Sequence, residues 1–129
     1  MYESEAVTRG VRVHVRSFFI PERSDPSDGR WLFAYRITIA NESSDTVQLL
    51  NRHWVIVDGN GEQEEVRGPG VVGEQPVLAP GESFEYTSGC PLGTPVGTMT
   101  GSYEMQLEDG TTFEAEIATF TLAEGRALN

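Results

Sequence analysis

Apolar residues recur at every second position along most of this chain, and this spacing is typical of β-strands that bury one face. In the segment VRVHV, Val11, Val13 and Val15 fall on one side, while Arg12 and His14 fall on the other. Similar patterns occupy residues 11–20, 31–43, 46–61, 61–68, 78–88 and 100–122, the last being a hairpin that turns at Asp109-Gly110. The chain is therefore expected to consist of short strands joined by tight turns.

Helix is expected to be almost absent, because no window places apolar residues three and four positions apart over several turns. Seven or eight short antiparallel strands predict an all-β fold, a single-domain β-sandwich of the fibronectin type III or immunoglobulin kind. A closed barrel is the alternative. The domain is expected to span residues 1–129, with a core over about 8–123 and short flexible termini.

Two details of the core can be predicted from the strand patterns. Trp54 stands on a central strand and is expected to fill the space between the sheets. In the last hairpin, Phe120 and Leu122 fall out of register with Ile117. A β-bulge near Ala118 or Thr119 would return them to the core face.

The charge of the chain limits its partners. The formal net charge is −11, and residues 68–125 hold nine acids and no base. Nucleic-acid binding is not expected, because it depends on clustered cations. No apolar run approaches the roughly 20 residues that span a bilayer, and the N-terminus does not resemble a secretion signal. These features predict a cytoplasmic protein with no membrane partner.

The segment VRGPGVVGEQP holds Gly68, Gly70 and Gly73 in the spacing G-x-G-x-x-G, which also marks dinucleotide-binding loops. Such loops bind phosphate because a helix begins at the glycine turn and offers free N–H groups. Here Pro76 and Pro80 interrupt any helix, and glutamates flank the segment. We therefore expect an irregular connection whose glycines allow unusual backbone conformations. A loop that contacts a protein partner through an exposed Val71 or Val72 is the alternative.

Residue types that carry catalysis or bind metals are sparse. His14, His53 and Cys90 stand at no recognised metal-ligand spacing, and no nucleophile elbow is present. No catalytic residue, metal site or cofactor is therefore predicted. If a partner binds, the expected contact residues are Arg67, Val71, Val72, Glu74 and Gln75, with Arg52, His53 and Trp54 as secondary candidates.

Several stretches carry a resemblance to a known family. RHW, VRGPGVVGEQPVLAPGESFEYTSG and GSYEM are similar to the bacterial ApaG family, and the match extends over nearly the whole chain. The resemblance implies a fibronectin type III-like sandwich and no established enzymatic activity. It also implies genetic links to cobalt and magnesium handling, to diadenosine tetraphosphate hydrolysis and to ribosomal RNA methylation.

Similar domains in eukaryotic F-box proteins and in a DNA-polymerase-delta-interacting protein are thought to mediate protein interactions. The resemblance therefore implies a non-catalytic protein-interaction module. The alternative is a small-ligand binder, either for a divalent cation or for a nucleotide or pyrophosphate at Gly68, Gly70 and Gly73. Fold alone does not choose between them.

Overall fold

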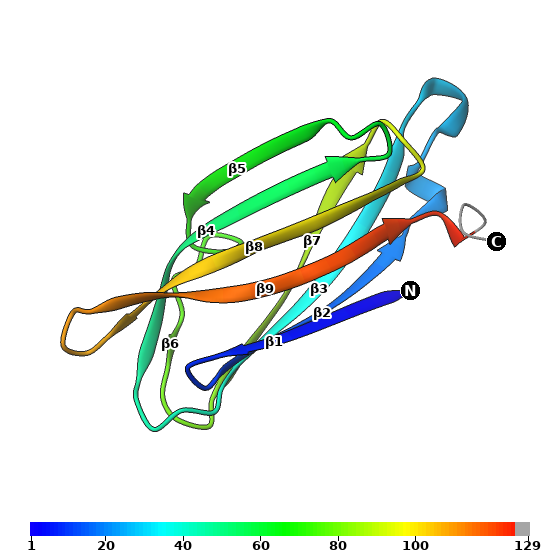
Figure 1. The fold of residues 1–129 in the computed structure, drawn as a ribbon. Helices are drawn as coiled ribbons and strands as arrows, with labels where there is room; N and C mark the ends of the chain where they lie inside the picture. Colours follow the sequence, from blue (N-terminus) through cyan, green and yellow to red (C-terminus); the bar gives the residue numbers. More distant parts are fainter. Residues whose placement is uncertain (126–129) are drawn as a thin grey trace.

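A computed structural model describes residues 1–125 of the protein, and these residues form two antiparallel sheets packed face to face (Figure 1). One sheet has the order β1-β2-β3-β7, and the other has the order β5-β4-β8-β9 with β6 paired to β4. The strands are β1 (Tyr2–Thr8), β2 (Val11–Phe19), β3 (Trp31–Asn41), β4 (Val47–Asp58), β5 (Gln63–Pro69), β6 (Val77–Leu78), β7 (Ser83–Leu92), β8 (Val96–Leu107) and β9 (Thr112–Ala123). The predicted β-sandwich is confirmed.

Alternating residues face the interior as the sequence predicts. In β2, Val11, Val13 and Val15 are fully buried, while the residues between them are not. Two single turns of 3-10 helix, at Pro21–Arg23 and Pro26–Asp28, lie between β2 and β3. Strand β1 was not among the expected strands; it begins at Tyr2 and pairs with β2 along its whole length.

The sandwich is closed along one side, where the edge strands β1 and β9 meet. The Ser4 hydroxyl donates to the carbonyl of Ala118 at 2.8 Å, and the amide of Glu116 donates to the Thr8 hydroxyl at 3.0 Å. The predicted bulge lies here: Ala118 and Thr119 together stand opposite the single residue Thr100. Side chains of β1 thus satisfy backbone groups on the edge of β9.

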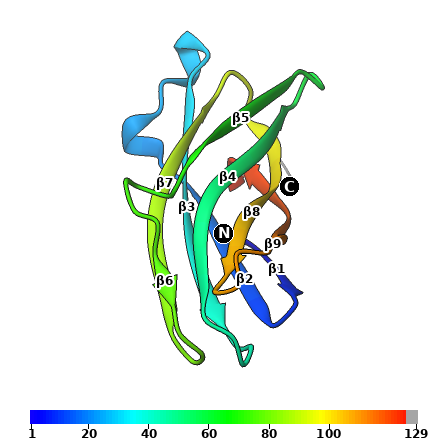
Figure 2. The ribbon, with the colours of Figure 1, turned by 90° about the vertical axis from the view of Figure 1, so that its left-hand side faces the viewer.

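The opposite side of the sandwich lies between β7 and β5, the other two edge strands. Residues 70–76, which connect β5 to β6, lie on this side, and the side view shows the connection next to β7 (Figure 2). The glycine segment is therefore placed between the two sheets at their open edge.

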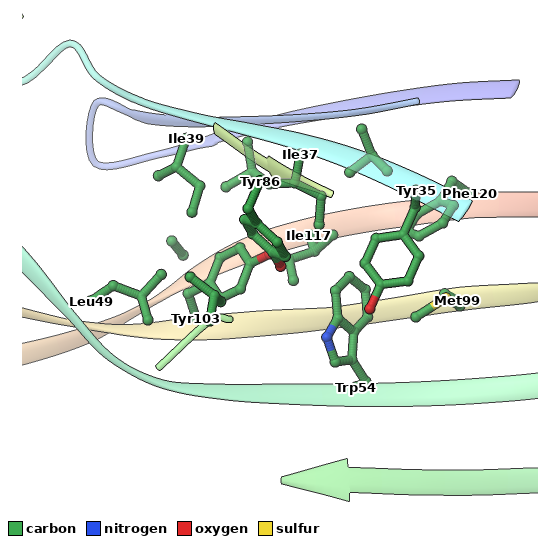
Figure 3. Packing of buried hydrophobic residues seen from close by; sticks show 14 of the residues in the cluster. Tyr35, Ile37, Ile39, Leu49, Trp54, Tyr86, Met99, Tyr103, Ile117 and Phe120 are labelled. Atoms are coloured by element: carbon green, nitrogen blue, oxygen red, sulfur yellow. The ribbon is translucent and has the colours of Figure 1, made fainter. Parts of the chain in front are cut away.

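Aromatic rings fill the centre of the core (Figure 3). The Trp54 ring packs edge-on against Tyr35, Tyr103 and Phe120, with centroid distances of 5.4, 6.3 and 5.9 Å. Tyr35 belongs to one sheet and the other three residues to the second, so Trp54 fills the inter-sheet space as predicted. The Tyr86 and Tyr103 hydroxyls also hydrogen-bond to each other between the sheets.

Candidate interaction site at the glycine segment

The glycine segment forms a very small β-hairpin. The amide of Val71 donates to the carbonyl of Glu74 at 2.8 Å, and the amide of Glu74 donates back to the carbonyl of Val71 at 2.9 Å. The two residues between them have positive φ, 44° at Val72 and 81° at Gly73. Positive φ at both central residues is the requirement of a type I′ turn. No helix begins here, so the helix N-terminus of a dinucleotide site is missing from this segment.

Each glycine of the motif has a local structural reason. Gly73 occupies the second position of the turn, where a left-handed conformation suits glycine. Gly70 has φ 60°, and a Cβ there would overlap the carbonyl group of Glu74. At Gly68 a Cβ would lie 2.9 Å from Nη2 of Arg52. The spacing G-x-G-x-x-G is accounted for by this hairpin and its neighbour, Arg52.

The Arg52 side chain supports the hairpin through hydrogen bonds to its backbone. Arg52 follows the Leu50 bulge in β4 and shares the inward face of the strand with Trp54. Its side chain crosses Gly68 on the adjacent strand, and Nη1 donates to the carbonyls of Pro69 and Gly70 at 2.8 and 2.9 Å. Two charge-assisted hydrogen bonds to backbone fix the start of the hairpin.

The structure divides the predicted contact residues into buried and exposed groups. Val71 is 1% exposed and Trp54 is 3% exposed, so both belong to the core. The expectation of an exposed Val71 is corrected, because the hairpin turns Val71 inward between the sheets. Contact of Val71 and Trp54 with a partner stays a prediction. Val72 is 57% exposed at the tip of the turn. Glu74 and Gln75 beside it are also exposed.

His53 and Arg67 lie on the outer face of the sheet that contains β4 and β5. The His53 Nε2 atom is 2.7 Å from Oε2 of Glu65, and Nη2 of Arg67 is 3.5 Å from the same oxygen. The hydrogen bond with His53, followed by the charge of Arg67, lowers the pKa of Glu65. Arg52, His53 and Arg67 line one hollow of about 540 Å³ together with Glu104 and Glu114, whereas Val71 and Val72 line a second hollow beside the hairpin. The structure therefore does not bring all the predicted contact residues together.

A hollow of about 240 Å³ lies between the hairpin and strand β7. Its lining combines Arg52, hydroxyl-bearing side chains and apolar groups: Tyr35, Arg52, Trp54, Val71, Val72, Gly73, Tyr86 and Ser88. Sequence reasoning did not assign Tyr35, Tyr86 or Ser88 to this site. Alternation does place them on inward faces, but only the folded chain shows which inward residues lie next to the hairpin.

The other residues considered for chemistry lie apart from this hollow. Cys90 is buried, and this burial, with a smaller contribution from the charge of Glu64, raises the pKa of its thiol to about 11. Within residues 1–125, no three histidine, cysteine, aspartate or glutamate side chains are grouped so that they could hold a metal ion. In the same part of the chain, no helix has the length and apolar character needed to cross a bilayer.

Comparison with known proteins identifies the family. The ApaG domain family matches residues 21–107. A protein ApaG from Dechloromonas aromatica is 57% identical over 124 residues, covering 95% of this chain and 98% of the relative. The chain belongs to the ApaG family. A second ApaG protein, from Beijerinckia indica, is 58% identical over 90% of this chain and 89% of its own length.

Solved structures agree with this ApaG assignment. The putative ApaA protein from Bordetella pertussis is 53% identical and superposes with a TM-score of 0.87, covering 90% of this chain and 94% of that one. The C-terminal domain of wzt has a TM-score of 0.52 at 12% identity, covering 94% of this chain and 77% of that one, and shares the fold alone. The biochemical role of ApaG is not assigned by these relationships.

Proposed function

We propose that this ApaG protein is a non-catalytic, cytoplasmic protein-interaction module and that its partner contacts the tip of the glycine hairpin. The observation that carries the proposal is the exposure and backbone conformation of Val72. This residue is 57% exposed and has φ 44°, a left-handed conformation that is uncommon for a β-branched side chain. Strain of this kind concentrates at sites of function.

The surroundings of Val72 support an interface. Two hydrogen bonds within the hairpin and two from Arg52 fix the tip, so a partner would lose little conformational entropy on binding it. The Gln75 side chain also donates to the carbonyl of Leu50 at 2.9 Å. An apolar side chain on a rigid support with polar neighbours is the arrangement of an interface anchor and its rim.

Affinity capture with a matched control tests the proposal. Purified protein is immobilised, exposed to lysate of the source organism, and its bound proteins are quantified for wild type, Val72→Asp and Val77→Asp. Val77 is also 57% exposed but lies on β6, away from the turn. We expect a reproducible partner that Val77→Asp retains and Val72→Asp loses. Absence of any reproducible partner, or equal loss in both variants, would contradict the proposal.

A further inference from the structure

The hollow beneath the glycine hairpin carries a positive charge in a strongly acidic protein. Its lining contains Arg52 and no carboxylate, although the chain has a net charge of −11. Five other arginines form salt bridges with carboxylates: Arg12, Arg16, Arg30, Arg36 and Arg67. Within residues 1–125, no carboxylate oxygen lies within 4.0 Å of the Arg52 guanidinium. The half-buried Arg52 guanidinium instead donates to two backbone carbonyls, and Glu104 and Glu114 line a neighbouring hollow with it without forming a salt bridge.

Arg52 also has unused hydrogen-bond donors. A guanidinium carries five N–H groups, and only Nη1 of Arg52 is bonded among the described residues. Hydroxyl groups share the same lining, since Ser88 of β7 stands directly across from Tyr35 of β3. The hollow can thus donate hydrogen bonds to an oxygen acceptor from Arg52 and from Ser88.

Strand β7 borders the hollow and is an edge strand over all ten of its residues. It pairs with β3 on one side, and its other side makes no backbone hydrogen bond within the described part of the chain. An extended peptide can add to such an edge through main-chain hydrogen bonds, and its alternate side chains then point toward the interior. The inward residues Tyr86 and Ser88 show where such a side chain would point.

The size and walls of the hollow restrict what can enter. Its 240 Å³ is below the roughly 300–1,000 Å³ of sites for drug-sized ligands, so it suits one side chain better than a nucleotide. Trp54 and Val71 supply apolar walls for methylene groups. A short apolar stem that ends in a carboxylate matches both the walls and the charge of Arg52.

We propose that the partner adds an extended strand to the free edge of β7 and inserts an aspartate or glutamate side chain into the hollow, where its carboxylate binds Arg52 and Ser88. This inference rests on the proposed interaction function and specifies the partner's chemistry. Strand pairing supplies affinity that is independent of sequence, and the acidic residue supplies specificity. Val72 lines the hollow from the hairpin side, so the same segment would contact both the acidic side chain and the strand that carries it.

Selection of binders from a displayed library of short random peptides tests this proposal. The intact protein is the target, and each peptide is flanked on both sides by Gly-Ser spacers so that no terminus is free. We expect selected peptides to share one acidic position within an alternating, strand-forming pattern. A synthetic peptide with that acid changed to its amide should bind about tenfold more weakly or worse, as for loss of a charged hydrogen bond. In ¹⁵N-labelled protein, bound peptide should shift the amides of residues 83–90 and the Arg52 Nε–H signal.

This test changes the peptide and leaves the protein unchanged. Its result therefore does not depend on whether a protein with a substitution at Arg52 would fold. Ser88→Ala, which leaves Arg52 and the hairpin intact, should weaken the acidic peptide more than its amide form. Selected peptides without acid enrichment, equal binding of acid and amide, or shifts confined to another surface would overturn the proposal. If lysate capture still depends on Val72 while these results fail, the interaction function stands and this partner chemistry is wrong.

Discussion

The hydroxyl groups of Tyr86 and Tyr103 hydrogen-bond to each other between the two sheets of the sandwich. Tyr86 comes from β7 and Tyr103 from β8, and both side chains are buried. Burial raises the pKa of both phenols, so both are neutral at physiological pH. This polar pair lies in an apolar core, where each hydroxyl depends on the other for a partner.

Replacing both members of this pair should therefore cost less stability than the two single replacements added together. Tyr86→Phe or Tyr103→Phe leaves a buried hydroxyl without its partner, and each should reduce the free energy of unfolding by about 1–3 kcal/mol. The double variant removes both polar groups and should lose less than the sum of the two. Urea unfolding of the wild type, the two single variants and the double variant gives the coupling energy. Additive losses would show that the hydrogen bond between the two hydroxyls contributes little to stability.

Stability should fall at alkaline pH. Tyr35, Tyr86 and Tyr103 have folded-state pKa values raised above the ordinary 10.0, mainly by burial. A group whose pKa is raised on folding contributes stability below its unfolded pKa and loses it as pH rises toward the folded pKa. The free energy of unfolding should thus decrease above about pH 10, and tyrosinate absorbance should appear with unfolding. Titration of all four tyrosines in the folded protein would contradict this prediction.

Gly68→Ala should loosen the glycine hairpin. The new Cβ would lie 2.9 Å from Nη2 of Arg52, so the guanidinium must move and strain its bonds to Pro69 and Gly70. We expect a loss of about 1–2 kcal/mol, with faster amide exchange at Gly70. Gly93→Ala is the matched control, because its Cβ would lie 4.0 Å from the nearest atom outside its chain neighbours, the Gly29 carbonyl oxygen. Equal effects at both positions would show that Arg52 does not restrain the hairpin.

Val72→Asn should stabilise the protein and weaken partner binding. Asparagine tolerates the left-handed region better than valine, so the free energy of unfolding should rise by about 1 kcal/mol. The same change removes the exposed apolar side chain from the turn. Thermal unfolding and the capture assay measure the two effects separately. If the variant is more stable and binds the partner equally well, Val72 is not part of the interface.

Cys90 should be unreactive in the folded protein. Its thiol is buried and has its pKa raised to about 11, so little reactive thiolate is present at neutral pH. A disulfide reagent such as Ellman's should label it slowly at pH 8 and rapidly in denaturant. Rapid labelling of the folded chain would show that the β7 side of the sandwich opens readily.

Much of the fold could be predicted from the sequence, because two-residue alternation fixes which side chains face inward. The bulge at Ala118 and Thr119 could be predicted for the same reason, since it is the shift that buries both Ile117 and Phe120. Strand β1 was not expected, because its residues are only half-buried and include polar side chains such as Ser4 that serve as edge contacts.

The site was harder to predict than the fold. Arg52 and Trp54 share a face of β4, but an arginine between polar neighbours gives no sign that its side chain runs inward beneath a hairpin. The burial of Val71 depends on the reversal at Val72-Gly73, and valine in a left-handed turn runs against residue preference. The hollow beside β7 is formed by residues from four separate segments, which only the packed sheets bring together.

Arg52 and the three glycines maintain the hairpin through backbone contacts, and none of those contacts involves the side chains of Val72 or Glu74. The tip residues can therefore vary without disturbing the scaffold beneath them. An ApaG protein could acquire a new binding preference through substitutions at two surface positions, one on each side of Gly73, in the way that antibody loops diversify on an unchanged framework.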